Sequence, residues 1–563
     1  MERAGNGVGE RWDRWLWPVA WALSALAVYL SGLTLWTVWV ARSEVPWRDQ
    51  WTYIDDAREI MAHHWGRLWY SYWGHRIVIS RLFAVLDVRF WRALSSPVLV
   101  VELGFQAVHA ALLIWIGWQL FARRSQPVFV IFAALIIQLC FSSLQMENFI
   151  WAADPGYLLV WTTATASFLL LAISAGRAEL IAGCVFLGIV STLSCPNGIF
   201  VWPVLVLQAW ILRLSMRVRV LLAACGALII AAYFWHYDPG PDLGMGAGRA
   251  LLHPWQSIPI VGMLAAATLT SVSVRCAMSV GCIVLVAVVY ILIKVWRYHP
   301  PALLSAYGAL AVFALLTLAG MMTSRISPEF IAERVRLHLL VFPSRYYTTV
   351  FFFWAGLGGV SLWMAMKNSR EWPQLVAAGS MVAVVALGTL FWQIGEAANW
   401  RGYYREIDVA GSALIMHVDD PANSALAQIY PDAGLRDRIS AWLEQRRMAL
   451  FSQRRATLVG QSVGNIEDEH CAGRGETAVR VDDGVYRITG WAANSPRDLV
   501  FADGSSRIVG VARTGLRRPD LARGDVGWQG YARTPLAGVE VYGVLDDSGH
   551  YCRVGQPIAL PVK

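Results

Sequence analysis

The stretch from Leu16 to Ala41 contains no Asp, Glu, Lys, Arg or His. About 20 such residues suffice to cross the hydrocarbon core of a bilayer, whereas the apolar core of a signal peptide has only about 7 to 15. We therefore expect an uncleaved transmembrane helix here. Charged residues make up only 15% of the 563-residue chain, against about 25% in soluble proteins, so most of the chain is expected to lie in a membrane.

Uncharged stretches of similar length recur through the first two thirds of the chain. They lie at residues 16–41, 125–146, 155–176, 180–195, 198–212, 220–235, 276–293, 300–323, 346–366 and 372–395, with a further span ending near Phe121. Together they predict a polytopic α-helical membrane domain over residues 1–396 with about 11 transmembrane helices.

The remainder of the chain is more polar and predicts a soluble C-terminal part. Residues 397–457 are read as a helical connector, because apolar residues recur at helical spacing in "DAGLRDRISAWLEQRRMALF". Residues 458–563 alternate short apolar runs with Gly, Asp and Ser, which is typical of a small β-rich or α+β domain such as an antiparallel β-sandwich. Trp491 and Trp528 are candidates either for its core or for exposed aromatic binding surfaces.

The positive charges indicate the orientation of the chain. The net charge is +8, but many basic residues occupy short connections, such as Arg123 with Arg124 and Lys367 with Arg370. Since such loops face the cytoplasm, the N-terminus is placed inside, the first long loop (42–97) outside, and no nucleic-acid partner is expected. If residues 255–274 spanned the membrane, every later loop would lie on the opposite side. We therefore interpret them as a non-spanning or re-entrant helix.

This topology makes the C-terminal domain extracytoplasmic. Cys471 and Cys552 are its only two cysteines, and a disulfide between them would require an oxidising compartment. Two unpaired thiols are the alternative.

The outer loops collect polar residues suited to catalysis. Asp49 follows the first span closely, where a carboxylate suits a general base acting on an acceptor hydroxyl; a structural salt bridge to Arg48 or Arg76 is the alternative. For the acidic residues Asp55 and Asp56, a solvated amphipathic helix is the alternative to a functional role.

Two later outer turns supply further candidates. "QMENFIWA" brings Glu147 and Asn148 to the outer surface as metal ligands or substrate clamps, unless they merely cap a helix. The last outer loop carries Arg325 and Arg345 against the positive-inside trend. Arginine forks bind phosphate bidentately, so these residues are candidates for a lipid-linked phosphate, with ordinary headgroup contact as the alternative.

Four short motifs resemble those of the GT-C superfamily of integral-membrane glycosyltransferases. They are "WRDQW" with Asp49, "GHRIVISRL" with His75 and Arg76, "QMENFIWA" with Glu147 and Asn148, and "PSRYYTT" with Arg345. The segments "IYPD" and "LEQRRMALF" are similar to those of bacterial members with an external β-rich tail. The chain departs from the pattern in having "AADPGY" where a Gln would follow the Trp, and in lacking a clear pair of adjacent acids unless Asp55 and Asp56 serve.

The resemblance implies a GT-C-like fold and a multi-pass enzyme of the bacterial inner membrane. Such an enzyme takes a sugar from a polyprenyl-phosphate carrier and transfers it to a glycan, lipid or protein acceptor on the extracytoplasmic face. It implies Asp49 as the catalytic base. His75, Arg76, Glu147, Asn148, Arg325 and Arg345 are our candidates for substrate binding. No cofactor is assigned, and a divalent metal ion is left open.

Two other classes of function compete with this hypothesis. A transporter or flippase would show charges within the spans or inverted repeats, whereas the polar groups here gather on one face and no repeat is seen. A non-catalytic scaffold of a polysaccharide assembly complex would keep the same architecture without the chemistry.

Overall fold

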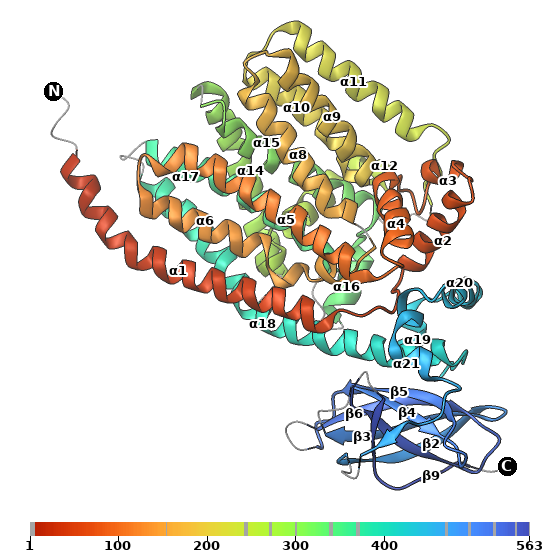
Figure 1. The fold of residues 1–563 in the computed structure, drawn as a ribbon. Coiled ribbons are helices and arrows are strands. Elements are labelled where there is room, and N and C mark those ends of the chain that lie inside the picture. The colour runs from red at the N-terminus through yellow and green to blue at the C-terminus, as the bar shows by residue number, and fades with distance from the viewer. Residues whose placement is uncertain are drawn as a thin grey trace.

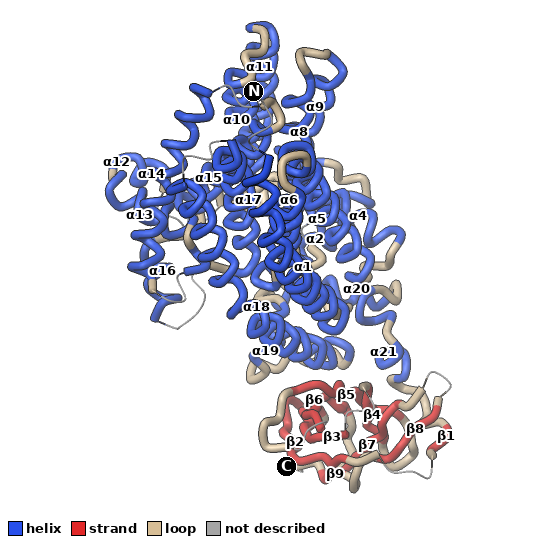
Figure 2. The backbone as a smooth tube through the Cα atoms, turned by 90° about the vertical axis from the view of Figure 1, so that its left-hand side faces the viewer, coloured by secondary structure: helices blue, strands red, loops and turns tan. Residues whose placement is uncertain are grey.

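The computed structural model describes residues 6–153, 155–240, 246–269, 273–298, 301–336, 342–367, 372–467, 471–493, 497–521, 525–546 and 549–561. A large helical body occupies one end of the molecule and a β-sheet domain the other, with α18 to α21 between them (Figures 1 and 2). The expected division into an apolar helical part and a C-terminal β-rich domain is confirmed.

The helical body is built from seventeen helices and several short helical turns among the described residues. The helices are α1 (Asn6–Ala41), α2 (Gln50–Met61), α3 (Gly66–Trp69), α4 (Val78–Phe90), α5 (Ser95–Gly117), α6 (Gln126–Cys140), α7 (Glu147–Ile150), α8 (Pro155–Ser174), α9 (Ala178–Ser194), α10 (Val201–Ile211), α11 (Met216–Phe234), α12 (Ala247–Leu252), α13 (Pro254–Ala265), α14 (Val274–Tyr298), α15 (Leu304–Ser324), α16 (Pro328–Arg336) and α17 (Tyr347–Lys367). The short turns include η2 (Ser143–Gln145), η3 (Pro196–Phe200) and η5 (Ser344–Tyr346).

Seven helical stretches among the described residues are long and apolar enough to cross a membrane. They are Arg14–Ala41, Ser95–Ala122, Gln126–Gln145, Pro155–Ser174, Met216–Phe234, Leu304–Ser324 and Ser344–Lys367. Three more expected spans coincide with shorter apolar helices, Ala178–Ser194, Pro196–Ile211 and Val274–Tyr290. The sequence suggested about 11 spans, and that finer count stays a prediction.

The segment expected to be non-spanning contains the short helix α13. It has 12 residues, fewer than the roughly 20 that a straight helix needs to cross a bilayer. It packs against the following helix α14, where Gly262 and Gly281 bring the two backbones close together. By length alone, α13 does not complete a crossing.

The long loop after α1 folds into α2, α3 and α4. Helices α2 and α4 pack together, and between them Arg81 Nε lies 2.7 Å from an Asp56 carboxylate oxygen, with both side chains buried. Asp55 is buried as well and is paired with Arg58 at 2.8 Å. The alternative in which these acids form the solvated face of an amphipathic helix is therefore wrong, because each carboxylate has been taken out of water together with an arginine.

Helix α18 (Trp372–Ile415) links the membrane part to the rest of the chain. Its 44 residues would measure about 66 Å as a straight helix, and it lies beside α1 along much of the body (Figure 1). The expected domain boundary between residues 396 and 397 falls inside this continuous helix. Helices α19 (Ser424–Ile429), α20 (Ala433–Gln445) and α21 (Arg454–Leu458) complete the connector.

One apolar core joins the outer loop, the connector and the β domain. It contains Trp47 and Trp51 from the loop, Tyr404 from α18, Phe451 from the connector and Tyr531 from the sheet, all buried. Because these side chains come from all three parts of the chain, the β domain is packed onto the end of the helical body that carries Trp47 and Trp51. A separate core, which includes Trp161 and Phe313, fills the membrane part.

The β domain is one continuous sheet of nine strands among the described residues. The strands are β1 (Asn465–Ile466), β2 (Gly473–Asp482), β3 (Val485–Ala493), β4 (Asp498–Ala502), β5 (Ile508–Leu516), β6 (Asp525–Arg533), β7 (Gly538–Val544), β8 (His550–Arg553) and β9 (Ile558–Ala559). Their order is β1-β8-β7-β4-β5-β6-β3-β2, with β9 on β7, and only the β1–β8 pair is parallel. The sheet curls until β9 contacts β2, so a single rolled sheet replaces the expected two-sheet sandwich.

The interior of this rolled sheet explains the role of Trp528. It is fully buried and packs against Phe501, and it lies opposite Gly490 in the β3–β6 register. A Cβ atom at Gly490 would come within 2.4 Å of the Trp528 ring. Trp528 is therefore a core residue and is not available to bind carbohydrate.

Cys471 and Cys552 are joined by a disulfide, which connects the segment before β2 to β8. Their Cα atoms lie 5.5 Å apart. The remaining six cysteines are free, and all six belong to the helical body.

Candidate functional site

Asp49 lies immediately before α2, at the end of the helical body that packs against the β domain. It is half-buried, and one carboxylate oxygen accepts a hydrogen bond of 3.1 Å from the hydroxyl of Tyr72. Burial raises the pKa of Asp49 and outweighs the opposing effects of Tyr72, Arg345 and Arg48. Since no ion pair to Asp49 is seen among the described residues, its carboxylate keeps acceptor capacity for a substrate hydroxyl.

The backbone before Asp49 is held in an unusual conformation. Arg48 has φ of 51°, a left-handed conformation that is uncommon for a residue with a Cβ atom. Its N–H donates to the carbonyl of Ile429 in the connector at 2.7 Å. Strained backbone of this kind is often found at functional sites, where the surrounding structure holds it in place. Here it fixes the directions of the Arg48 and Asp49 side chains.

Tyr72 reaches Asp49 from a tight hairpin. The backbones of Tyr72 and His75 exchange two hydrogen bonds of 2.9 and 2.8 Å, and the intervening Trp73 and Gly74 both have positive φ, as in a type I′ turn. A Cβ atom at Gly74 would lie 2.4 Å from the carbonyl oxygen of Pro239. Glycine is thus required both for the turn and for the close approach of the neighbouring loop.

Glu147 holds two arginines beside Asp49. Its buried carboxylate lies 3.0 Å from Arg48 Nη1 and also contacts Arg345 Nη1 through the same oxygen, Oε1. The backbone N–H of Arg345 donates to the second oxygen at 3.3 Å. The side chains of Arg48 and Arg345 remain 45% and 27% exposed, so both guanidinium groups are anchored at one edge and accessible at another.

Asn148 fastens the two turns that carry this cluster. Its side-chain amide donates to the carbonyl of Arg345 at 2.9 Å and to the Thr348 hydroxyl at 2.7 Å. Ser344, the first residue of η5, accepts from the N–H of Glu147 at 3.2 Å. The "MEN" and "SRY" motifs therefore meet in space, and Asn148 serves to position Arg345.

His75 and Arg325 form a second pair near the same cluster. Arg325 Nη2 lies 2.6 Å from His75 Nε2, while His75 Nδ1 lies 2.9 Å from the carbonyl of Gly74. Burial, followed by the charges of Arg325 and Arg345, lowers the pKa of His75 to about 3. The ring is therefore neutral at ordinary pH, with Nδ1 donating to Gly74 and Nε2 accepting from Arg325.

Arg76 is placed differently from the other predicted substrate ligands. It is fully buried, and its guanidinium nitrogens contact the backbone carbonyls of Trp69, Tyr233 and Trp235. These contacts tie the first outer loop to the end of α11. Each of its three guanidinium nitrogens contacts a backbone carbonyl, so the structure gives Arg76 a role in holding the loop.

Asp55 and Asp56, the adjacent acids of the first loop, are engaged with arginines, as described above. Arg67 and Arg438 also lie within 4 Å of these carboxylates. Within the described part of the chain, no group of three or more His, Cys, Asp or Glu side chains is arranged to hold a metal ion.

Several residues near Asp49 were not expected from the sequence. The Tyr430 hydroxyl, from the "IYPD" segment, lies 3.0 Å from Thr52 Oγ1, and Tyr403 of α18 accepts a hydrogen bond of 3.1 Å from Trp47. The charges of Glu147 and Arg345 also act on the pKa of Arg334 in α16. Tyr72 was also not expected. Only for this residue did the sequence carry a local signal, because the Trp-Gly step before His75 favours a tight turn that would bring Tyr72 back toward α2.

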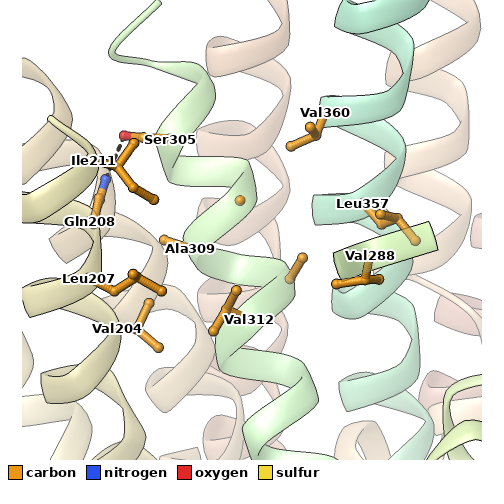
Figure 3. Close-up of a pocket in the computed structure, with 12 residues that line it drawn as sticks. Val204, Leu207, Gln208, Ile211, Val288, Ser305, Ala309, Val312, Leu357 and Val360 are labelled. Atoms are coloured by element: carbon orange, nitrogen blue, oxygen red, sulfur yellow. Dashed lines mark hydrogen bonds between the residues drawn. The ribbon is translucent and has the colours of Figure 1, made fainter. Parts of the chain in front are cut away.

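A small cavity lies elsewhere, within the membrane part between α10, α14, α15 and α17 (Figure 3). Its walls are mainly aliphatic, and the amide nitrogen of Gln208 donates to the Ser305 hydroxyl at 2.9 Å. None of the residues around Asp49 lines it. This cavity has no charged group and is not the candidate site.

No protein-family model, curated protein or solved structure matches this chain. The functional argument therefore depends on the site itself: a half-buried carboxylate with two arginines clamped beside it on one buried glutamate.

Proposed function

We propose that this chain is a membrane glycosyltransferase that moves a sugar from a polyprenyl-phosphate carrier to an envelope glycan, lipid or protein acceptor on the extracytoplasmic face. One observation carries the proposal. Asp49 lies beside Arg48 and Arg345, which share the carboxylate of Glu147, so a base and an anion-binding pair occupy one site.

The charges of the site suit a donor phosphate. Arg48, Arg345 and the neighbouring Arg325 outnumber the carboxylates of Asp49 and Glu147, and His75 is neutral. Arginine binds phosphate through paired N–H donors, and one nitrogen of Arg48 and of Arg345 is already oriented by Glu147. The site therefore offers preorganised positive charge where a lipid-linked phosphate would be presented.

In the proposed reaction Asp49 accepts the proton of the acceptor hydroxyl. The hydroxyl oxygen forms a bond to the anomeric carbon of the sugar while the bond from that carbon to the phosphate oxygen breaks, with inversion. Polyprenyl phosphate leaves as a stable anion, so no general acid is needed. Arg345 and Arg48 stabilise the charge that develops on its oxygens, a type of contribution that is usually the largest in catalysis.

The raised pKa of Asp49 supports its role as the base. Burial makes the carboxylate more basic than an exposed Asp, and a base works best when its pKa approaches the operating pH. The hydrogen bond from Tyr72 fixes the orientation of one carboxylate oxygen.

The disulfide of the β domain supports the proposed orientation. Disulfides persist in oxidising compartments such as the periplasm, and the β domain packs against the same outer loop that carries Asp49. A bacterial inner-membrane protein with its site and C-terminal domain on the extracytoplasmic side accounts for both features.

The test is the envelope glycan profile of a deletion strain complemented with variants. Asp49→Asn keeps the size of the side chain and removes the base, so product should fall by about 100-fold or more. Glu59→Gln, on the exposed side of α2, is the matched control and should restore the wild-type profile. An Asp49→Asn strain with normal glycans would exclude the enzyme and favour a scaffold.

A further inference from the structure

A row of three hydroxyl groups begins at the carboxylate of Asp49. The Tyr72 hydroxyl donates to Asp49 at 3.1 Å, and Thr52 Oγ1 lies 3.5 Å from the Tyr72 oxygen. The Tyr430 hydroxyl lies 3.0 Å from Thr52 Oγ1 at the other end of the row. All three side chains are partly exposed, so the row is accessible to a ligand that binds at Asp49.

The connector holds the last member of the row, Tyr430, in a fixed position relative to Asp49. The carbonyl of the preceding residue, Ile429, accepts the backbone N–H of Arg48 at 2.7 Å. Ile429 is also buried in the core that joins the loop, the connector and the β domain, and α20 packs against α2. The C-terminal part of the chain therefore contributes a side chain to the candidate site.

The direction of each hydrogen bond in the row follows from the number of protons. A hydroxyl group has one proton and two lone pairs, and burial raises the pKa of both Tyr72 and Tyr430, so both phenols stay protonated. Because Tyr72 donates its proton to Asp49, Thr52 must donate to Tyr72, and Tyr430 must then donate to Thr52. Within the described residues each oxygen keeps an unused lone pair, whereas no proton of the row is left for a ligand.

This pattern makes the row selective for ligand groups that donate hydrogen bonds. It accepts O–H groups, and it offers no proton to acceptor-only groups such as phosphate. Arg48 and Arg345 have the opposite preference, because a guanidinium group donates and cannot accept. The two sets of side chains next to Asp49 therefore separate phosphate from hydroxyl groups by their hydrogen bonding.

We propose that the row binds the acceptor of the transfer reaction and that this acceptor is a sugar residue, an inference that rests on the proposed function. A sugar ring carries several adjacent hydroxyls, which donate to Tyr72, Thr52 and Tyr430 while another is presented to Asp49. A serine or threonine side chain, or a simple lipid alcohol, has a single hydroxyl and leaves the rest of the row without a donor.

Trp73 adds an apolar surface next to the row. It is 49% exposed, and its ring packs edge-on against Tyr72 with 6.4 Å between the ring centroids. An exposed indole ring provides a large, rigid apolar face, which suits the C–H face of a sugar ring. The site thus offers a partner for both the apolar face and the hydroxyl edge of such a ring.

Two kinds of molecule present a sugar acceptor, and the row recognises the ring that they share. One is a growing envelope polysaccharide, and the other is the head of a glycolipid. A deletion strain complemented with Tyr430→Phe distinguishes them, because the transferred sugar should be depleted from the polysaccharide fraction in the first case and from the lipid fraction in the second. Depletion from the glycoprotein fraction alone would overturn the proposal.

The binding test uses the full-length protein in a detergent without a sugar headgroup, with ligand binding followed by saturation-transfer NMR. The probes are the methyl α-glycosides of glucose, galactose and mannose, and N-acetylthreonine methylamide represents a protein acceptor. We expect at least one glycoside to bind saturably and the threonine amide not to bind. Thr52→Val and Tyr430→Phe should each weaken glycoside binding about 10-fold, the effect of one lost hydrogen bond. Tyr70→Phe, in the same loop as Tyr72, is the matched control and should retain it.

A second probe, farnesyl phosphate, separates a failure of this inference from a failure of the proposed function. Arg345→Ala should weaken the binding of farnesyl phosphate and leave glycoside binding unchanged, and Tyr430→Phe should do the reverse. Binding of farnesyl phosphate that is insensitive to Arg345→Ala would contradict the proposed donor site. The sugar-acceptor inference is overturned if no glycoside binds the wild-type protein, if the threonine amide binds equally well, or if Thr52→Val and Tyr430→Phe bind the glycosides like the wild-type protein.

Discussion

The side chain of Arg345, in the turn that opens α17, contacts the carboxylate of Glu147, which lies 198 residues earlier in the chain. Arg48, which lies 99 residues before Glu147, contacts the same carboxylate oxygen. One buried acid therefore orients two guanidinium groups at the mouth of the site. This shared contact is the basis of the proposed phosphate-binding site.

Glu147 and Arg345 should be energetically coupled. Glu147→Ala and Arg345→Ala are each expected to lower stability by about 1 to 3 kcal/mol, because each leaves a charged hydrogen-bonding partner without its contact. The double variant should lose clearly less than the sum of the two. Chemical or thermal unfolding of the four proteins measures this, and additive losses would mean that the two side chains do not interact in the folded protein.

Tyr72→Phe should move the acid limb of the activity profile. The hydrogen bond from Tyr72 lowers the pKa of Asp49, so removing the hydroxyl should raise that pKa and protonate the base at a higher pH. Once a transfer assay exists, the pH at which activity falls to half on the acid side should increase, with the neutral-pH rate changed less. Tyr70→Phe, in the same loop, is the control, and an acid limb that stays in place would mean that Asp49 is not the titrating base.

Asp408 should make the packing of the β domain sensitive to acid. Burial opposes its ionisation, but Arg513, Arg455 and Arg497 together lower its pKa to about 2 from an ordinary value of 3.8. Because the folded pKa is the lower one, the stabilisation is complete above about pH 4 and is lost as the pH falls toward 2, an effect of about 2 kcal/mol. Asp408→Asn should be less stable at neutral pH and should lack this acid dependence when unfolding midpoints are measured between pH 5 and 2.

Removing the disulfide should destabilise the β domain selectively. The bond joins cysteines 81 residues apart, and loss of a native disulfide typically costs about 2 to 5 kcal/mol. Cys471→Ser with Cys552→Ser should therefore make the β domain more susceptible to protease while the membrane helices remain intact.

The same two cysteines also report on orientation. In cells, a membrane-impermeant maleimide should label Cys471 and Cys552 only after reduction, because the proposed location is oxidising. A lack of labelling even after reduction would contradict that location, because the impermeant reagent reaches only extracytoplasmic thiols.

Much of the architecture was accessible from local patterns. The uncharged stretch at Leu16–Ala41, the polar change after residue 396 and the short apolar runs after residue 458 predicted a helical membrane part and a β-rich domain, and both are present. The sandwich was not correct, because whether strands form one sheet or two depends on which edges pair, and alternating apolar residues look the same in both cases. The domain boundary near 396 stays a prediction, and it falls within the continuous helix α18.

The candidate site divides in the same way. The sequence alone determined which segments avoid water and which loops carry the acids and arginines. The free energy of placing a side chain in hydrocarbon depends on that residue alone, so it can be judged without the fold. Only the tertiary structure decided that Arg345 meets Glu147 and that the guanidinium group of Arg76 contacts backbone carbonyls. Pairing depends on distances across the fold between residues up to about two hundred positions apart, and no local pattern encodes those distances.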